Sequence, residues 1–150
     1  MNHDRTILLV EDDPNDEELT LRALRRNNVS NEVIVVRDGA EALDFLIPAG
    51  TGSERGFNEL PQLVLLDLKL PKIDGIEVLR QIRAHERTRL LPVVILTTST
   101  DEKDRLAGYS SGANSYVRKP VDFAEFAEAV RQLGVYWLIL NEPPPVPKPS

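Results

Sequence analysis

The residues of this sequence that could do chemistry are polar side chains that directly follow short aliphatic runs. Leu63–Leu66 is such a run, and it ends on the carboxylate of Asp67. A charge at the edge of an apolar core is costly unless a partner compensates it. Further runs end on or close to other side chains of this kind: Glu11 and Asp12, Thr97, and Lys119. These side chains form a candidate site at the ends of predicted strands.

Gathered in one place, these groups are suited to phosphoryl transfer onto a carboxylate. Glu11, Asp12 and Asp67 would repel one another unless a cation neutralised them. Ligands that offer only oxygen, without sulfur or imidazole, favour a hard ion such as Mg²⁺ or Mn²⁺. Beside such an ion Asp67 could act as a nucleophile, Thr97 could donate a hydrogen bond to a phosphoryl oxygen, and Lys119 could balance the added charge.

Taken one at a time, the same residues have ordinary structural explanations. An aspartate after a strand is most often a turn or capping residue, and Asp13, followed by Pro14, is predicted to cap the first helix. Thr97 alone could reflect β propensity, and Lys119 alone could lie in a loop. Their joint placement favours a site, because ligands of open α/β sheets bind outside the carboxyl ends of the strands.

The composition limits the kinds of function that remain. The chain has 150 residues, no cysteine and two histidines, so disulfides and thiolate sites are excluded and an imidazole-based metal site or triad is not expected. A net charge of -6 argues against nucleic acid as a partner. The N-terminus resembles no signal segment, and no apolar run approaches the length of a membrane span. We expect a soluble cytoplasmic protein without nucleic-acid or membrane partners.

The order of the apolar segments predicts an α/β fold. The runs expected as strands are Thr6–Val10, Glu32–Val36, Leu63–Leu66, Val93–Thr97 and Ser115–Val117. Helical spacing is found from Asp13 through Leu24, over Ala40–Ile47, Ile76–Arg83 and Asp104–Ser111, and from Phe123 onward. Strands that alternate with helices indicate a doubly wound, five-stranded parallel sheet with helices on both faces. Continuous aliphatic strands fit a sheet that is buried on both sides.

Two segments interrupt this alternation. Pro48–Glu59 is a long, glycine-containing connection of the kind that is often functional. Asn141–Ser150 is rich in proline and predicts an extended tail. The expected organisation is one domain over residues 1–140, with a C-terminal helix and extension from about residue 123, followed by the tail over 141–150.

Four motifs carry a family resemblance: LLVEDDP, LLDLKLPKIDG, ILTTS and SYVRKP. They are similar to the motifs of the receiver domains of two-component response regulators, over nearly the whole chain. The resemblance implies a flavodoxin-like fold with strand order 2-1-3-4-5, and phosphorylation of Asp67 by a histidine kinase. It implies these further roles: Glu11 and Asp12 as the acidic pair around Mg²⁺ (or Mn²⁺), Asp67 and the Lys69 backbone carbonyl as additional metal ligands, Thr97 and Tyr116 as switch residues, and Lys119 as the site lysine.

The resemblance also has consequences for the switch. Glu11 stands where the family more often has aspartate, and its longer side chain is expected to reach the ion through water. Thr98 and Lys69 would border the route of an attacking water and so tune the lifetime of the phosphoryl group. Phosphorylation would draw Thr97 inward and let Tyr116 rotate into the space behind it, as a population shift between two packings. The alternative for Tyr116 is a half-buried aromatic with its hydroxyl in water.

A narrower resemblance concerns the signalling pathway. RDGAEALDFL, GANSYVRKPVDF and YWLILNEPPP are similar to segments of single-domain response regulators that are paired with bacterial phytochrome histidine kinases. This resemblance implies that the kinase partner is a red-light-sensing bacteriophytochrome.

The apolar segment Val135–Leu140 predicts a protein interface. As a helix it is apolar all round, so only part of it can face its own domain. We expect a homodimer through the last helix and this segment, with the contributing side chains Phe126, Val130, Tyr136, Trp137, Leu138 and Leu140. The alternatives are a strand that crosses to a second copy and a terminus that folds over its own core, with Gly134 as a kink before it.

Three other functions share parts of this pattern. A phosphohydrolase similar to the haloacid dehalogenases would need a second aspartate two residues after the nucleophile, where this sequence has Lys69. A flavin-binding electron carrier would need a phosphate loop after the first strand, where Glu11–Asp13 would repel phosphate. A module that binds partners without phosphorylation would be expected to lack part of the acidic set. The favoured prediction is a response regulator whose only catalysis is phosphorylation and dephosphorylation of its own Asp67.

Overall fold

The computed structural model describes residues 6–26, 32–47, 60–120 and 122–145, and the predicted loop Pro48–Glu59 lies outside them. The strands are β1 (Ile7–Val10), β2 (Val33–Val36), β3 (Leu63–Leu66), β4 (Val93–Thr97) and β5 (Ser115–Arg118). The helices are α1 (Pro14–Arg26), α2 (Gly39–Leu46), α4 (Gly75–Ala84), α5 (Glu102–Ser110), α6 (Phe123–Gly134) and η2 (Val135–Leu140).

The strands form one parallel sheet in the order β2-β1-β3-β4-β5, which confirms the predicted doubly wound, flavodoxin-like fold. Val10 is in register with Val36 on one side and with Leu66 on the other. Leu66 is in turn in register with Ile95 of β4. Because the register is flush, the residues that follow β1 and β3 leave the sheet at the same level.

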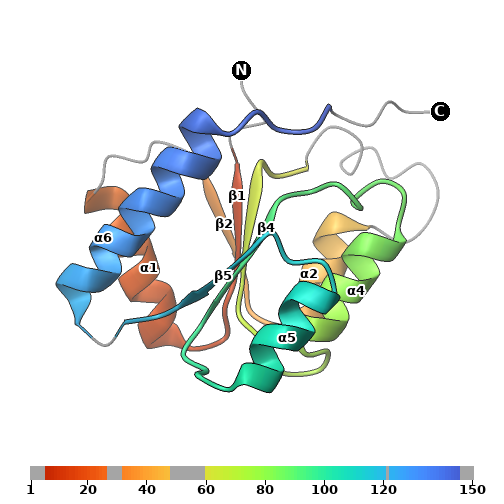
Figure 1. The fold of residues 1–150 in the computed structure, drawn as a ribbon, viewed down its shortest axis with the longest axis horizontal. Helices are drawn as coiled ribbons and strands as arrows, with labels where there is room; N and C mark the ends of the chain where they lie inside the picture. The colour runs from red at the N-terminus through yellow and green to blue at the C-terminus, as the bar shows by residue number, and fades with distance from the viewer. Residues whose placement is uncertain (1–5, 27–31, 48–59, 121, 146–150) are drawn as a thin grey trace.

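Alternate residues of the central strands pack into two separate cores. Leu8 and Val10 belong to the core beneath α2 and α4, whereas Ile7 and Leu9 belong to the core beneath α1 and α6. Figure 1 shows α1 and α6 on one face of the sheet and α2, α4 and α5 on the other. All four residues of β1 and of β3 are buried, as expected for strands that are covered on both faces.

Aspartates define where the helices begin. The Asp13 carboxylate accepts hydrogen bonds from the backbone N–H groups of Asn15 (2.8 Å) and Asp16 (3.3 Å), which confirms its predicted capping role. The Asp101 carboxylate accepts from the N–H of Lys103 at 2.9 Å, so α5 begins at Glu102, earlier than the predicted Asp104. The apolar pattern of this helix is weak, and its cap sets its start.

The chain continues from α6 into η2 without a break. Gly134 keeps helical torsion angles (φ -62°, ψ -46°), so it is not the kink that was considered. The segment is a wider helical turn, in which the N–H of Asn141 donates to the carbonyl of Tyr136 at 2.6 Å, and it is not a strand. Among the described residues, no helix has the length and apolar character needed to cross a membrane.

Candidate functional site

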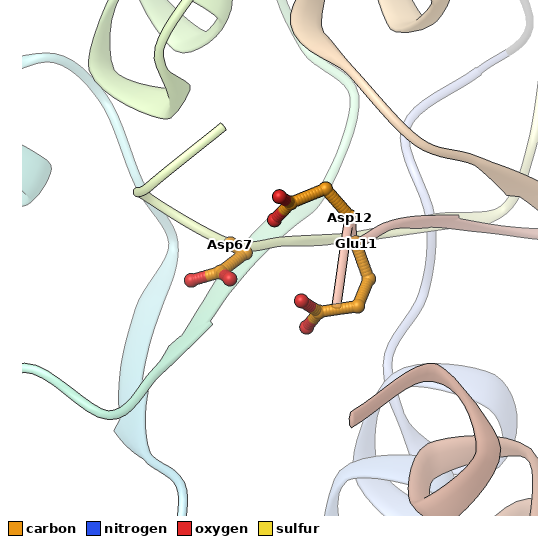
Figure 2. Close-up of side chains that lie close together, drawn as sticks. All are labelled: Glu11, Asp12 and Asp67. Atoms are coloured by element: carbon orange, nitrogen blue, oxygen red, sulfur yellow. The ribbon is translucent and has the colours of Figure 1, made fainter. Parts of the chain in front are cut away.

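Three carboxylates meet at the carboxyl edge of the sheet. Glu11 and Asp12 follow β1, and Asp67 follows β3, its neighbour in the sheet. One carboxylate oxygen from each residue lies within 4.8 Å of the others, and Figure 2 shows the three side chains around one shared space. Glu11 is 1% exposed, Asp12 is exposed and Asp67 is half-buried. The structure therefore brings together the acidic set that the sequence predicted.

The backbone around Asp67 is held from two sides. Its N–H donates to the carbonyl of Val10 at 3.1 Å, and its carboxylate accepts from the N–H of Leu68 at 2.7 Å. A Cβ placed on Gly75, the first residue of α4, would lie 2.3 Å from the Asp67 carbonyl oxygen. Only a residue without a side chain allows α4 to approach this closely, so Gly75 helps to position Asp67.

Lys119 supplies the positive charge of the site. Its ammonium lies 2.5 Å from Glu11 Oε1, 2.9 Å from Asp16 Oδ2 and 3.8 Å from Asp67 Oδ2. The side chain is 5% exposed. Burial alone would lower the pKa of the ammonium, but the hydrogen bonds with Glu11 and Asp16 and the charge of Asp67 outweigh burial and raise it. Lys119 therefore stays charged and faces three carboxylates.

Glu11 carries the largest electrostatic strain of the site. Burial raises the pKa of its carboxyl group to about 7, and the charge of Asp67 adds to the increase. The hydrogen bond with Lys119 offsets only part of this effect. A divalent cation between these carboxylates would relieve the strain, and the all-oxygen donor set fits Mg²⁺ or Mn²⁺. Glu11, Asp12 and Asp67 are the residues that would hold it.

The predicted ligand Lys69 lies on the loop between β3 and α4. It lines an open cleft of about 470 Å³ together with Asp12, Leu68 and Asp74. The cleft places the loop beside the acidic cluster. The role of the Lys69 carbonyl as a metal ligand stays a prediction.

Thr97 ends β4, the strand next to β3, and is 1% exposed. Its hydroxyl oxygen accepts a hydrogen bond from the N–H of Ser99 at 3.2 Å, and its carbonyl accepts from the N–H of Lys119 at 2.6 Å. The Ser99 hydroxyl in turn donates to Asp104 at 2.6 Å. This polar chain links the end of β4 to α5, and the sequence analysis assigned no role at the site to Ser99 or Asp104.

Tyr116 lies on β5 and packs inward. Its ring contacts the core beneath α4, and a Cβ on Gly108 would approach its Cδ2 atom to 3.1 Å. The hydroxyl is buried and has no hydrogen-bond partner among the described residues. Burial raises the pKa of the phenol, and the nearby Ser99 offsets part of the increase. The alternative of a hydroxyl that stays in water does not hold for this conformation.

The structure divides the predicted dimer residues into two groups. Phe126 (4% exposed) and Val130 (1%) lie in the core beneath α1 and α6 and cannot take part in an interface, which corrects the prediction. Trp137 and Leu138 pack partly against the same core, and Gln62 donates to their carbonyls at 3.4 and 3.5 Å. The exposed members are Tyr136 (50%) and Leu140 (64%), together with Ile139 (74%), which the prediction omitted. An apolar helix alone does not reveal which of its sides meets the core.

The arrangement matches a known family and two curated relatives. The family model of the response regulator receiver domain matches residues 7–131. A probable methanogenesis regulatory protein, FilR2, of Methanothrix harundinacea (strain 6Ac) is 45% identical over 138 residues, which cover 92% of this chain and 86% of FilR2. The response regulator Rcp1 of Synechocystis sp. is 38% identical over 137 residues, which cover 91% of each chain.

Solved structures show the same likeness. The phosphorylated cyanobacterial phytochrome response regulator RcpA has a TM-score of 0.85 at 37% identity, covering 94% of this chain and 99% of RcpA. The Mn²⁺-bound form of Rcp1 has a TM-score of 0.83 at 37% identity, with coverage of 94% and 99%. The bacteriophytochrome response regulator RtBRR has a TM-score of 0.71 at 54% identity, with coverage of 94% and 84%. This chain belongs to the response regulator receiver domain family.

Proposed function

We propose that this response regulator accepts a phosphoryl group on Asp67 from the phosphohistidine of a histidine kinase. The observation that carries the proposal is the cluster of Glu11, Asp12 and Asp67 with the buried Lys119 ammonium 3.8 Å from Asp67 Oδ2. A carboxylate oxygen of Asp67 forms the new bond to phosphorus, and the phosphorus–nitrogen bond breaks with its electron pair going to the imidazole. The only catalysis is on the protein's own aspartate.

Each residue of the cluster has a separate task in this reaction. Glu11, Asp12 and Asp67 would hold Mg²⁺, together with the Lys69 carbonyl. The bound ion would neutralise the carboxylates and the incoming phosphoryl oxygens. Lys119 is placed to donate a hydrogen bond to a phosphoryl oxygen on Asp67, where the group adds close to two negative charges. Gly75 keeps the Asp67 backbone at this position.

The signal would leave the site through Thr97 and Tyr116. A phosphoryl oxygen on Asp67 would offer the Thr97 hydroxyl, whose oxygen accepts from the N–H of Ser99, a strong acceptor for its own proton. The Tyr116 hydroxyl is buried and lies near Ser99, so movement of Thr97 and Ser99 would change the polar surroundings of this hydroxyl. Phosphorylation would shift the population between two positions of Tyr116 and change the face formed by α5, β5 and α6.

We infer that the kinase is a bacteriophytochrome acting in the cytoplasm. Support comes from Rcp1, RcpA and RtBRR, of which RcpA and RtBRR are described as phytochrome or bacteriophytochrome response regulators. The likeness to FilR2 shows that related chains are also assigned to other regulation. Phosphotransfer from a purified bacteriophytochrome kinase should be at least about tenfold faster than from an unrelated histidine kinase. Equal rates would contradict the phytochrome assignment and leave the acceptor role intact.

We propose that η2 mediates a homodimer. Tyr136, Ile139 and Leu140 expose apolar surface on one short segment, and a second copy could cover them symmetrically. The double variant Tyr136→Glu/Ile139→Glu should sediment as a monomer. Leu90→Glu, which alters an exposed apolar residue elsewhere on the surface, should keep the wild-type sedimentation coefficient. A monomeric wild type would overturn this part of the proposal.

The decisive experiment on the acceptor is intact mass spectrometry after incubation with acetyl phosphate and Mg²⁺. Wild type should gain one phosphoryl adduct that depends on Mg²⁺, and Asp67→Asn should gain none. Under the same conditions a known receiver domain serves as the positive control. Absence of an adduct on wild type would favour a module that binds its partners without phosphorylation.

A further inference from the structure

A fourth carboxylate, that of Asp16, contacts the Lys119 ammonium but is not one of the three carboxylates of the acidic cluster. Asp16 lies in the first turn of α1, and its Oδ2 atom is 2.9 Å from the Lys119 ammonium. The Asp16 side chain is 27% exposed, whereas the Lys119 side chain is 5% exposed. Asp16 and Lys119 also line the same groove between the start of α1 and the start of α6. Asp16 thus reaches Lys119 from the side of α1.

The distances show how Lys119 distributes its hydrogen bonds. An ammonium has three donors, and two of them are taken by Glu11 at 2.5 Å and Asp16 at 2.9 Å. Asp67 Oδ2, at 3.8 Å, lies beyond hydrogen-bond distance. The ammonium therefore lies closest to Glu11 and Asp16, with which it forms hydrogen bonds, and it forms only a longer ion pair with the proposed phosphoacceptor.

The backbone of Asp16 is fixed, so its short side chain reaches Lys119 from a defined place. Its N–H donates to the Asp13 carboxylate at 3.3 Å, and its carbonyl accepts from the Thr20 hydroxyl at 2.8 Å. An aspartate held in this way loses little further freedom when it pairs with an ammonium, because only its two side-chain torsions remain.

We propose that Asp16 is a positioning residue that holds the Lys119 ammonium back from Asp67 and keeps it partnered when Glu11 turns to a divalent cation. This inference rests on the proposed function of the acidic cluster. Without Asp16, the acceptors near Lys119 would be Glu11 and Asp67, which are the carboxylates that the cation needs. The ammonium and the cation would then compete for them, and their like charges would repel at short range.

The first test is a calorimetric titration with Mg²⁺ in the absence of any phosphoryl donor. Asp16→Asn should bind Mg²⁺ about tenfold more weakly than wild type, because one charge-assisted acceptor of Lys119 is lost. Asp16→Glu should recover most of the affinity. Glu18→Gln removes the same charge from the same helix at a carboxylate that is 61% exposed, and it should change the affinity less than about twofold.

The second test separates positioning from chemistry. The rate of phosphorylation by acetyl phosphate is measured against Mg²⁺ concentration for the same variants, after thermal unfolding has shown that they are folded. For Asp16→Asn the half-saturating Mg²⁺ concentration should rise by about tenfold, and the rate at saturation should stay within about twofold of wild type.

Two outcomes would overturn the proposal. Equal Mg²⁺ affinities for Asp16→Asn and Glu18→Gln would overturn it, because bulk charge would then explain the effect. A lower saturated rate with unchanged Mg²⁺ dependence would also overturn it, because Asp16 would then act on the transfer step. If wild type accepts no phosphoryl group, the proposed function fails, and the calorimetric comparison still tests whether Asp16 positions Lys119.

Discussion

At opposite edges of the sheet lie two cationic side chains, the buried Lys119 and the half-buried Arg83, and the partners of these two cations are of opposite kinds. At the carboxyl edge, Lys119 faces the carboxylates of Glu11, Asp16 and Asp67. At the amino edge, Arg83 of α4 donates only to neutral oxygens: the carbonyls of Gly112 (2.9 Å), Arg89 (2.9 Å) and Leu91 (2.7 Å) and the side chain of Asn114 (2.9 Å).

This difference separates a structural contact, made by Arg83, from a functional site, built around Lys119. The guanidinium of Arg83 connects α4 to the segments that precede β4 and β5. Its acceptors are neutral, so they provide no negative charge that could bind a cation. Burial lowers the pKa of Arg83, and its hydrogen-bond acceptors in the described part of the chain include no carboxylate that would raise it again. Lys119 has more carboxylates near it than it can neutralise, so its surroundings can still take up a divalent cation. The carboxyl edge is therefore distinguished as the functional edge by its excess of negative charge around Lys119, and not by the burial of the cation.

The largest expected effect is on the lysine itself. Lys119→Met removes the donor placed for a phosphoryl oxygen, so phosphorylation by acetyl phosphate at saturating Mg²⁺ should slow by about 100-fold. Mg²⁺ should bind more tightly, because the competing ammonium is gone. Lys103→Met, an exposed lysine of α5, is the control and should behave as wild type. A Lys119→Met variant that is phosphorylated at the wild-type rate would show that Lys119, like Arg83, has no part in the reaction.

The arginine should show the opposite pattern. Arg83→Met leaves several backbone acceptors without a donor and should lower the free energy of unfolding by roughly 3 kcal/mol. Its phosphorylation rate, measured well below the melting temperature, should be unchanged. Arg80→Met removes a 61% exposed arginine from the same helix and should cost no more than about 0.5 kcal/mol. Urea unfolding and the acetyl phosphate assay together check both parts.

A matched pair of glycines sharpens the contrast. Gly75→Ala brings a methyl group against the Asp67 carbonyl, and it should cost about 2 kcal/mol and slow phosphorylation by about tenfold. Gly112→Ala strains a backbone with φ +109° beside Arg83 and should cost about as much. Only the first variant should affect phosphorylation. Equal losses of rate in both would mean that the two edges are coupled through the sheet.

The smallest effect is expected at the rim of the site. Thr98 is exposed and lines the groove beside Lys119, where an attacking water would approach. Thr98→Ala should change the lifetime of the phosphoryl group by about threefold, which is less than 1 kcal/mol in the barrier. Thr100→Ala, on the same groove, is the control. The decay of the adduct is followed by intact mass, and an unchanged lifetime would remove Thr98 from the water route.

Much of the fold and the acidic set could be predicted because both depend on short apolar runs and on the residues that directly follow them. Apolar runs of three to five residues predicted strands whose ends lie within one residue of the observed ends, as for Leu63–Leu66. Flush parallel register then places Glu11 and Asp67 side by side. The predicted start of α5 was wrong because a single hydrogen bond from the N–H of Lys103 to the Asp101 carboxylate sets it. The weak apolar periodicity of this segment gives no signal for where the helix begins.

The sequence by itself determined the alternation of strands and helices, the residues that end the strands, and the oxygen-only chemistry of their side chains. Only the tertiary structure decided that Lys119 pairs with Asp16, 103 residues away, that Phe126 and Val130 face inward while Tyr136 and Leu140 face outward, and that the Tyr116 hydroxyl is buried. The reason is physical. Periodicity encodes which side of an element is apolar, but the choice among several possible partners depends on distances that exist only once the helices have packed on the sheet.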